Sequence, residues 1–94
     1  MSNIFIRSMS VDGVEVTLCN GSMYVCVNDK IEIEAKILED KTWVLYDNGE
    51  RIILSNLTKV WEHVVDLINH YNLFSDEWKN KHYDTLIEFF KILE

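Results

Sequence analysis

Glu34 and Lys36 come closest to a catalytic pattern, because they lie two residues apart in a segment that alternates like a β-strand. A strand carboxylate and lysine at this spacing fit half of a metal-dependent nuclease site, in which an upstream aspartate completes the metal site and water is activated. Asp12 or Asp29 would supply that aspartate. The simpler interpretation is that Glu32, Glu34 and Lys36 are the outward residues of an alternating strand. No helix is expected ahead of the motif, so a nuclease is the least favoured function.

Three further titratable residues fall on the polar side of an expected helix. His63 and His70 are seven residues apart, about 10 Å along a helix axis, so only one of them can bind a metal ion together with Asp66. Two ligands are too few for zinc, and a solvated face is the preferred interpretation. His82 falls on the apolar side of a second expected helix near Trp78, where a histidine with satisfied hydrogen bonds is expected.

The sequence holds no nucleophile elbow and no glycine-rich phosphate loop. Cys19 and Cys26 lack CxxC spacing and are expected to be ordinary thiols in a reducing cytosol. We therefore expect a protein that is not an enzyme and that needs no metal or cofactor.

Turn signals divide the first 55 residues into five or six short strands. Three turns are tight dipeptides that tolerate positive φ, namely Asp12-Gly13, Asn20-Gly21 and Asn48-Gly49. Two more are expected at residues 28–30 and 39–41. Hairpins of this kind predict an antiparallel meander.

Side-chain alternation fixes the expected registers of neighbouring strands. The turn at 20–21 pairs Val16 with Val25, and a three-residue loop pairs Val25 with Ile33. The first hairpin adds Met9 and Val11 to the same face and sets Arg7 opposite Leu18. One face then carries the apolar side chains Val14, Val16, Leu18, Met23, Val25 and Val27.

After Ser55 the apolar period changes from two to 3.6. Ser55 or Asn56 is expected to cap a helix that runs to about Tyr71, with an apolar arc of roughly 160°. Ser75 is expected to cap a second helix that runs to about Leu93. The short connection makes the helices antiparallel neighbours. The expected fold is α+β in a single domain, residues 1–94: a sheet in 1–55 and a helical hairpin in 56–94, packed on one sheet face.

The 94 residues include 9 Lys and Arg against 16 Asp and Glu, which gives a net charge of −7. This charge repels nucleic-acid backbones and anionic membranes and attracts a basic protein surface. Neither a signal peptide near the first residues nor a membrane-spanning stretch is indicated, so a cytoplasmic location is expected.

The apolar residues exceed what one packing face needs. The hairpin Thr42–Leu54 is apolar on both faces, and the second helix has an apolar arc of roughly 220°. Either the sheet curls into a partial barrel that buries these residues, or part of this surface is an exposed patch. The second helix offers Tyr83, Ile87 and Phe90 as an alternative patch.

If the patch is exposed, we expect a partner to bind the outer face of the hairpin, because Tyr and Arg are enriched at binding hot spots. The same patch would also serve a homodimer. Acidic residues at the turn and on the preceding strand would form a rim suited to a basic partner. The expected contact residues are Val44, Tyr46, Arg51 and Ile53, with Asp47, Glu50, Glu32 and Glu34 in the rim.

In size, acidity and lack of proline or catalytic residues, the chain resembles small host-directed phage proteins and the immunity proteins that neutralise toxins. This resemblance involves no motif and implies no particular residue. It implies a protein that binds and inhibits a protein partner, such as an anti-CRISPR or anti-restriction inhibitor or a toxin-immunity protein. The alternative is a module that sequesters a small molecule or nucleotide.

Overall fold

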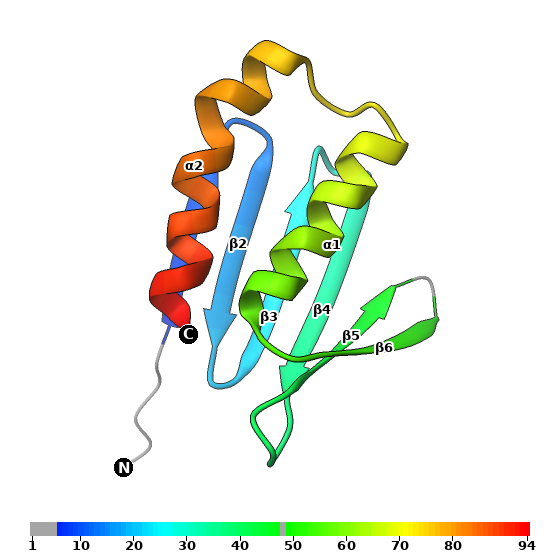
Figure 1. The fold of residues 1–94 in the computed structure, drawn as a ribbon, viewed down its shortest axis with the longest axis vertical. Helices are drawn as coiled ribbons and strands as arrows, with labels where there is room; N and C mark the ends of the chain where they lie inside the picture. The colour runs from blue at the N-terminus through cyan, green and yellow to red at the C-terminus, as the bar shows by residue number, and fades with distance from the viewer. Residues whose placement is uncertain (1–5, 48) are drawn as a thin grey trace.

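The computed structural model describes residues 6–47 and 49–94, and it confirms the α+β fold with a six-stranded antiparallel meander (Figure 1). The strands follow one another across the sheet in chain order, and two helices follow them. The elements are β1 (Ile6–Val11), β2 (Val14–Cys19), β3 (Ser22–Val27), β4 (Ile31–Ile37), β5 (Trp43–Asp47), β6 (Glu50–Leu54), α1 (Leu57–His70) and α2 (Asp76–Leu93).

The expected strand registers are confirmed. Val16 pairs with Val25, Val25 pairs with Ile33, and Arg7 lies opposite Leu18. The β1–β2 turn has positive φ angles of 27° at Asp12 and 99° at Gly13. The partner of Gly49 in its turn, Asn48, lies outside the described residues. Local turn chemistry and alternation thus set the sheet, as expected for hairpins.

Both helix starts are set by side-chain caps. The side chain of Asn56 accepts a hydrogen bond from the backbone N–H of Lys59, so Asn56 rather than Ser55 caps α1. Ser75 accepts one from Trp78 and caps α2, as predicted. These caps satisfy backbone donors that would otherwise lack partners in the first turn.

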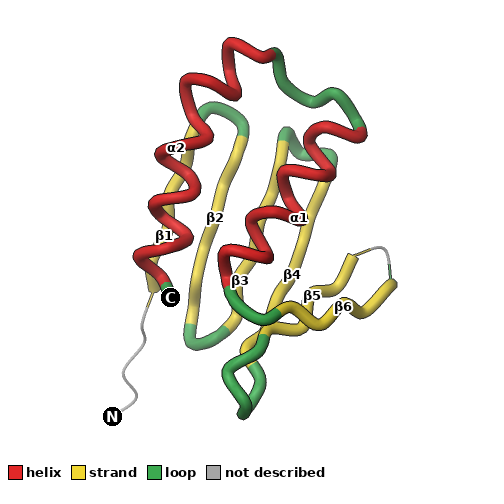
Figure 2. The backbone as a smooth tube through the Cα atoms, in the orientation of Figure 1, coloured by secondary structure: helices red, strands yellow, loops and turns green. Residues whose placement is uncertain are grey.

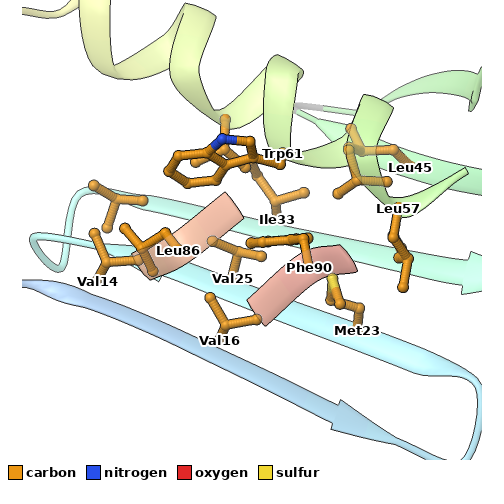
Figure 3. Packing of buried hydrophobic residues seen from close by; sticks show 14 of the residues in the cluster. Val14, Val16, Met23, Val25, Ile33, Leu45, Leu57, Trp61, Leu86 and Phe90 are labelled. Carbon is orange, nitrogen blue, oxygen red and sulfur yellow. The ribbon is translucent and has the colours of Figure 1, made fainter. Parts of the chain in front are cut away.

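Both helices lie on the same face of the sheet and form one core with it (Figures 1 and 2). Leu86 and Phe90 of α2 meet Trp61 and Leu57 of α1 above the inward residues of the central strands (Figure 3). The rings of Trp61 and Phe90 lie 5.4 Å apart. The inward sheet residues in this core are Val14, Val16, Leu18, Met23, Val25, Val27, Ile33, Ala35, Trp43 and Leu45.

Most of the broad apolar arc of α2 is used internally. Phe90 is fully buried, and Tyr83, Ile87 and Phe89 are partly buried against the core. Ile92 is the exception, with 67% of its surface exposed. The alternative patch expected on this helix is therefore wrong for Phe90, because its ring fills the space between helix and sheet.

The sheet stays open, and β5 and β6 run crosswise to the longer strands (Figures 1 and 2). In the described part of the chain, β1 and β6 are the two edges, and they do not pair with each other. The face opposite the helices is left without a helical layer in the same part of the chain. The sheet therefore does not close into a barrel, and the choice between a partial barrel and an exposed patch depends on how far the outward residues of β5 and β6 are buried.

Candidate functional site on the open sheet face

A row of side chains crosses the open face of the sheet. Tyr24 on β3 pairs with Glu34 on β4, and Glu34 pairs in turn with Tyr46 on β5. Arg51 on β6 pairs with Tyr46 and ends the row. Residues directly opposite on one face lie close enough for their side chains to interact. The register thus places a carboxylate between two tyrosines.

The tyrosines of this row are well exposed. Tyr24 is 48% exposed and Tyr46 41%, and neither has a helix above it in the described structure. A shallow groove of about 500 Å³ lies along the same face. Its outward lining residues are Glu15, Thr17, Tyr24, Cys26, Glu32, Glu34 and Tyr46. We call this surface, together with Arg51 and Ile53, the open-face patch.

Carboxylates dominate the charge of the groove. Glu15 and Glu32 flank Cys26 in the row next to the tyrosines. Glu34 lies 3.3 Å from the ammonium of Lys36, which neutralises part of its charge. Aromatic faces beside carboxylates suit cationic side chains, because both attract positive charge.

The structure places the residues expected at the interface in three different environments. Tyr46, Arg51 and Ile53 are exposed on the open face, as expected, and Ile53 is 53% exposed. Glu50 is exposed at the β5–β6 turn. Val44, which pairs with Lys36 and Ile53 on the neighbouring strands, is only 2% exposed. The expectation that Val44 offers its side chain to a partner is wrong.

Asp47 also departs from its expected place in the rim. It lies on the helix side of the hairpin, and its Oδ2 is 3.1 Å from Nε2 of His63 on α1. Both side chains are largely covered. The solvated position expected for His63 is therefore wrong, whereas Asp66 and His70 are exposed as expected.

His82 is mostly buried, as its position on the apolar side of the second helix predicted. Its ring lies 4.9 Å from that of Trp78, and Nε2 lies 3.8 Å from a carboxylate oxygen of Asp12. The side chain projects from α2 toward the β1–β2 turn, and it is mostly buried there. His82 thus helps to join these two segments.

Tyr83 presents a buried polar atom that the sequence did not indicate. Its ring makes an edge contact with Trp61 at 5.4 Å. Its hydroxyl oxygen has no hydrogen-bond partner among the described residues, and burial raises the pKa of this phenol above its ordinary value. Burial favours the neutral form because the phenolate would lose its hydration.

Glu34 and Lys36 do not form the expected nuclease geometry. The strand neighbours of Glu34 are tyrosines, while Asp12 and Asp29 lie in turns at the strand ends. Among residues 6–47 and 49–94, no group of three His, Cys, Asp or Glu side chains is arranged so that it could hold a metal ion. The aspartate that was expected to complete a metal site with Glu34 is thus not beside it.

A second cavity lies on the helix side of the sheet. It has a volume of about 380 Å³ and is lined by Lys30, Ile31, Glu32, Asp47, Leu67, Tyr71 and Leu73. This volume is at the small end of the range for small-molecule sites. It is the structural feature that the ligand-sequestering alternative would require.

Sequence analysis did not include Glu15, Thr17, Tyr24 or Cys26 of the open-face patch in the expected interface, and Tyr24 is the aromatic residue among them. Alternation placed it on the outer face of β3, and the β3–β4 register placed it beside Glu34. The position of Tyr46 on the other side of Glu34 depends on the β4–β5 register. That register follows a loop in which the Asp40 carboxylate accepts hydrogen bonds from the Thr42 N–H and hydroxyl. These bonds hold the pKa of Asp40 below its ordinary value.

The chain matches no protein-family model, and no curated protein or solved structure shows significant similarity to it. Neither helix in the described structure has the length and apolar character to cross a membrane. The site must therefore be judged on its own geometry.

Proposed function

We propose that this protein binds a basic surface of a protein partner through the open-face patch and inhibits that partner by covering it. The observation that carries the proposal is the row Tyr24–Glu34–Tyr46, which is exposed on the uncovered face of the sheet. Exposed tyrosines on rigid strands lose little conformational freedom on binding. Anti-defence and toxin-immunity inhibitors are the classes this proposal favours.

Charge supports a basic partner over a nucleic acid. The net charge of −7 and the carboxylates of Glu15, Glu32 and Glu34 attract cationic side chains and repel phosphates. Arg51 and Lys36 lie at one side of the patch, where they can meet an acidic residue of the partner. The cytoplasm is the proposed location, because both cysteines are free thiols.

Site-specific photo-crosslinking in the native host tests the proposal. Benzoylphenylalanine replaces Tyr24 or Tyr46, and a matched control carries it at Tyr71, which is 54% exposed on the helix side. We expect one protein with a basic surface to crosslink from both open-face positions and not from Tyr71. Adducts from Tyr71 alone, or none from the open face, would contradict the proposal.

A further inference from the structure

The two tyrosines of the open-face patch stand on either side of one carboxylate. Tyr24 on β3 and Tyr46 on β5 both pair with Glu34 on β4, the strand between them. Neighbouring strands lie about 4.8 Å apart and side chains stand roughly perpendicular to a sheet, so the rings rise about 10 Å apart. In the described part of the chain, the two rings make no contact with each other. The space above Glu34 is thus bounded by an aromatic ring on two sides.

This space suits a cation. A positive charge midway between the rings would lie about 5 Å from each, within the range of about 6 Å over which aromatic faces attract cations. Glu34 supplies a carboxylate between the rings, and Glu32 adds a second one two residues away along β4 in the same groove. Arg51 pairs with Tyr46 on the side away from Glu34, so it stands outside the space.

The protein already brings one of its own cations to this carboxylate. Nζ of Lys36 lies 3.3 Å from Oε1 of Glu34, and 53% and 39% of the two side chains are exposed. An ion pair that is open to water contributes little to stability, because solvent screens it and holding two long side chains in place opposes it entropically. A cation from a partner can therefore take the place of Lys36 with little loss of stability.

We propose that the space between Tyr24 and Tyr46 receives an arginine side chain of the partner, an inference that rests on the proposed function. A guanidinium is planar, so it can turn one face toward each ring, and its edge can donate two parallel hydrogen bonds to the carboxylate of Glu34. A lysine ammonium has no flat face and is more strongly hydrated. The arrangement thus selects arginine over lysine.

Titration of the full ¹⁵N-labelled chain with three capped tripeptides, followed by NMR, tests the inference without the partner. The peptides are Gly-Arg-Gly, Gly-Lys-Gly and the neutral analogue with citrulline in place of arginine. We expect a dissociation constant of about 10 mM or tighter for the arginine peptide and one at least about threefold weaker for the lysine peptide. No saturable binding is expected for citrulline. The shifted amides should be those of Tyr24, Glu34 and Tyr46.

Two variants remove the expected contacts of the guanidinium. Glu34→Gln and Tyr46→Leu should each weaken binding of the arginine peptide by about fivefold, whereas Tyr46→Phe keeps the ring and should stay within about twofold of wild type. Glu62→Gln is the matched control for the charge, because Glu62 also has a lysine partner, Lys59 at 3.1 Å, but lies on α1. It is expected to bind as wild type does.

Removal of the competing cation should strengthen binding. Lys36→Gln leaves Glu34 unpaired, so we expect the arginine peptide to bind about twofold tighter. Lys59→Gln changes the net charge by the same amount on α1 and should have no effect. Binding that Lys36→Gln leaves unchanged or weakens would show that Lys36 does not occupy the place of the guanidinium, and it would overturn the inference.

The inference and the proposed function can fail separately. Equal binding of the arginine and lysine peptides, no binding of the arginine peptide, or shifted amides away from the open face would overturn the inference. A partner that still crosslinks from Tyr24 and Tyr46 would then leave the proposed function standing. Selective binding of the arginine peptide without any crosslinked partner would support the inference and contradict the proposed function.

Discussion

The indole Nε1 of Trp78 donates a hydrogen bond to the backbone carbonyl of Asp12, at 3.0 Å, and ties α2 to the β1–β2 turn. The Trp78 ring also stacks on Phe74 with centroids 3.7 Å apart. These contacts fix the position of α2 over the first two strands, which are distant from α2 in the sequence.

Trp78→Phe should therefore lower the free energy of unfolding by about 1 kcal/mol, because it removes the hydrogen bond and leaves a ring for stacking. Trp78→Ala should lower it by about 3 kcal/mol, since the stack is lost as well. Urea denaturation followed by circular dichroism measures both. Equal effects of the two variants would show that the stack contributes little, and an unchanged stability of Trp78→Phe would show that the hydrogen bond contributes little.

Gly13→Ala should destabilise the protein more than Gly49→Ala. Both glycines have positive φ, of 99° and 80°. A Cβ at Gly13 would lie 2.8 Å from Oδ1 of Asn28 and 3.2 Å from the Phe74 ring, whereas one at Gly49 meets nothing within 4 Å. We expect losses of about 3 and about 1 kcal/mol in denaturant titrations. Comparable losses would contradict the close packing at this turn.

Tyr83→Phe should leave stability at neutral pH unchanged or raise it by up to about 1 kcal/mol, because the buried hydroxyl has no partner in the described structure. The raised pKa of Tyr83 means that its neutral form stabilises the fold fully below about pH 10. This contribution is lost as the pH rises through the raised pKa. The variant should therefore lose less stability than wild type between pH 9 and 12, roughly the range of phenol titration. A clear destabilisation at pH 7 would show that the hydroxyl is hydrogen-bonded.

Asp47→Ala should affect stability rather than partner binding. It removes the contact with His63 on the helix side, and we expect a loss of about 1 kcal/mol in unfolding free energy. Partner affinity should stay within about twofold of wild type, because Asp47 does not lie on the open face. If partner affinity falls while the free energy of unfolding stays unchanged, Asp47 belongs to the interface.

The sequence was sufficient for the hairpin registers and the helix caps, because turn dipeptides, alternation and capping residues act over a few positions. It was insufficient where distant segments meet. The contact between Asp47 and His63 depends on how α1 lies over the hairpin. Val44 is buried although alternation places it on the same face as the exposed Tyr46, so alternation alone does not reveal its burial.

The open-face patch also combines features that local sequence signals predict with features that depend on how distant segments meet. The β5–β6 register, which the turn at Gly49 predicted, placed Tyr46 and Ile53 on one face, but the sequence left open whether that face is exposed. The neighbourhood of Tyr24 and Tyr46 required the β4–β5 register, which no tight-turn dipeptide specifies. A hot spot spread over several strands is therefore visible only in the folded sheet.

The central claim is tested most directly by the dissociation constant between the crosslinked partner and the double variant Tyr46→Ala, Ile53→Asp. Both side chains are exposed, so the variant should keep its fold, with Tyr71→Ala as the control on the helix side. We predict binding weakened by about 100-fold or more in the double variant and unchanged in the control. A folded double variant that binds as tightly as wild type would contradict the account.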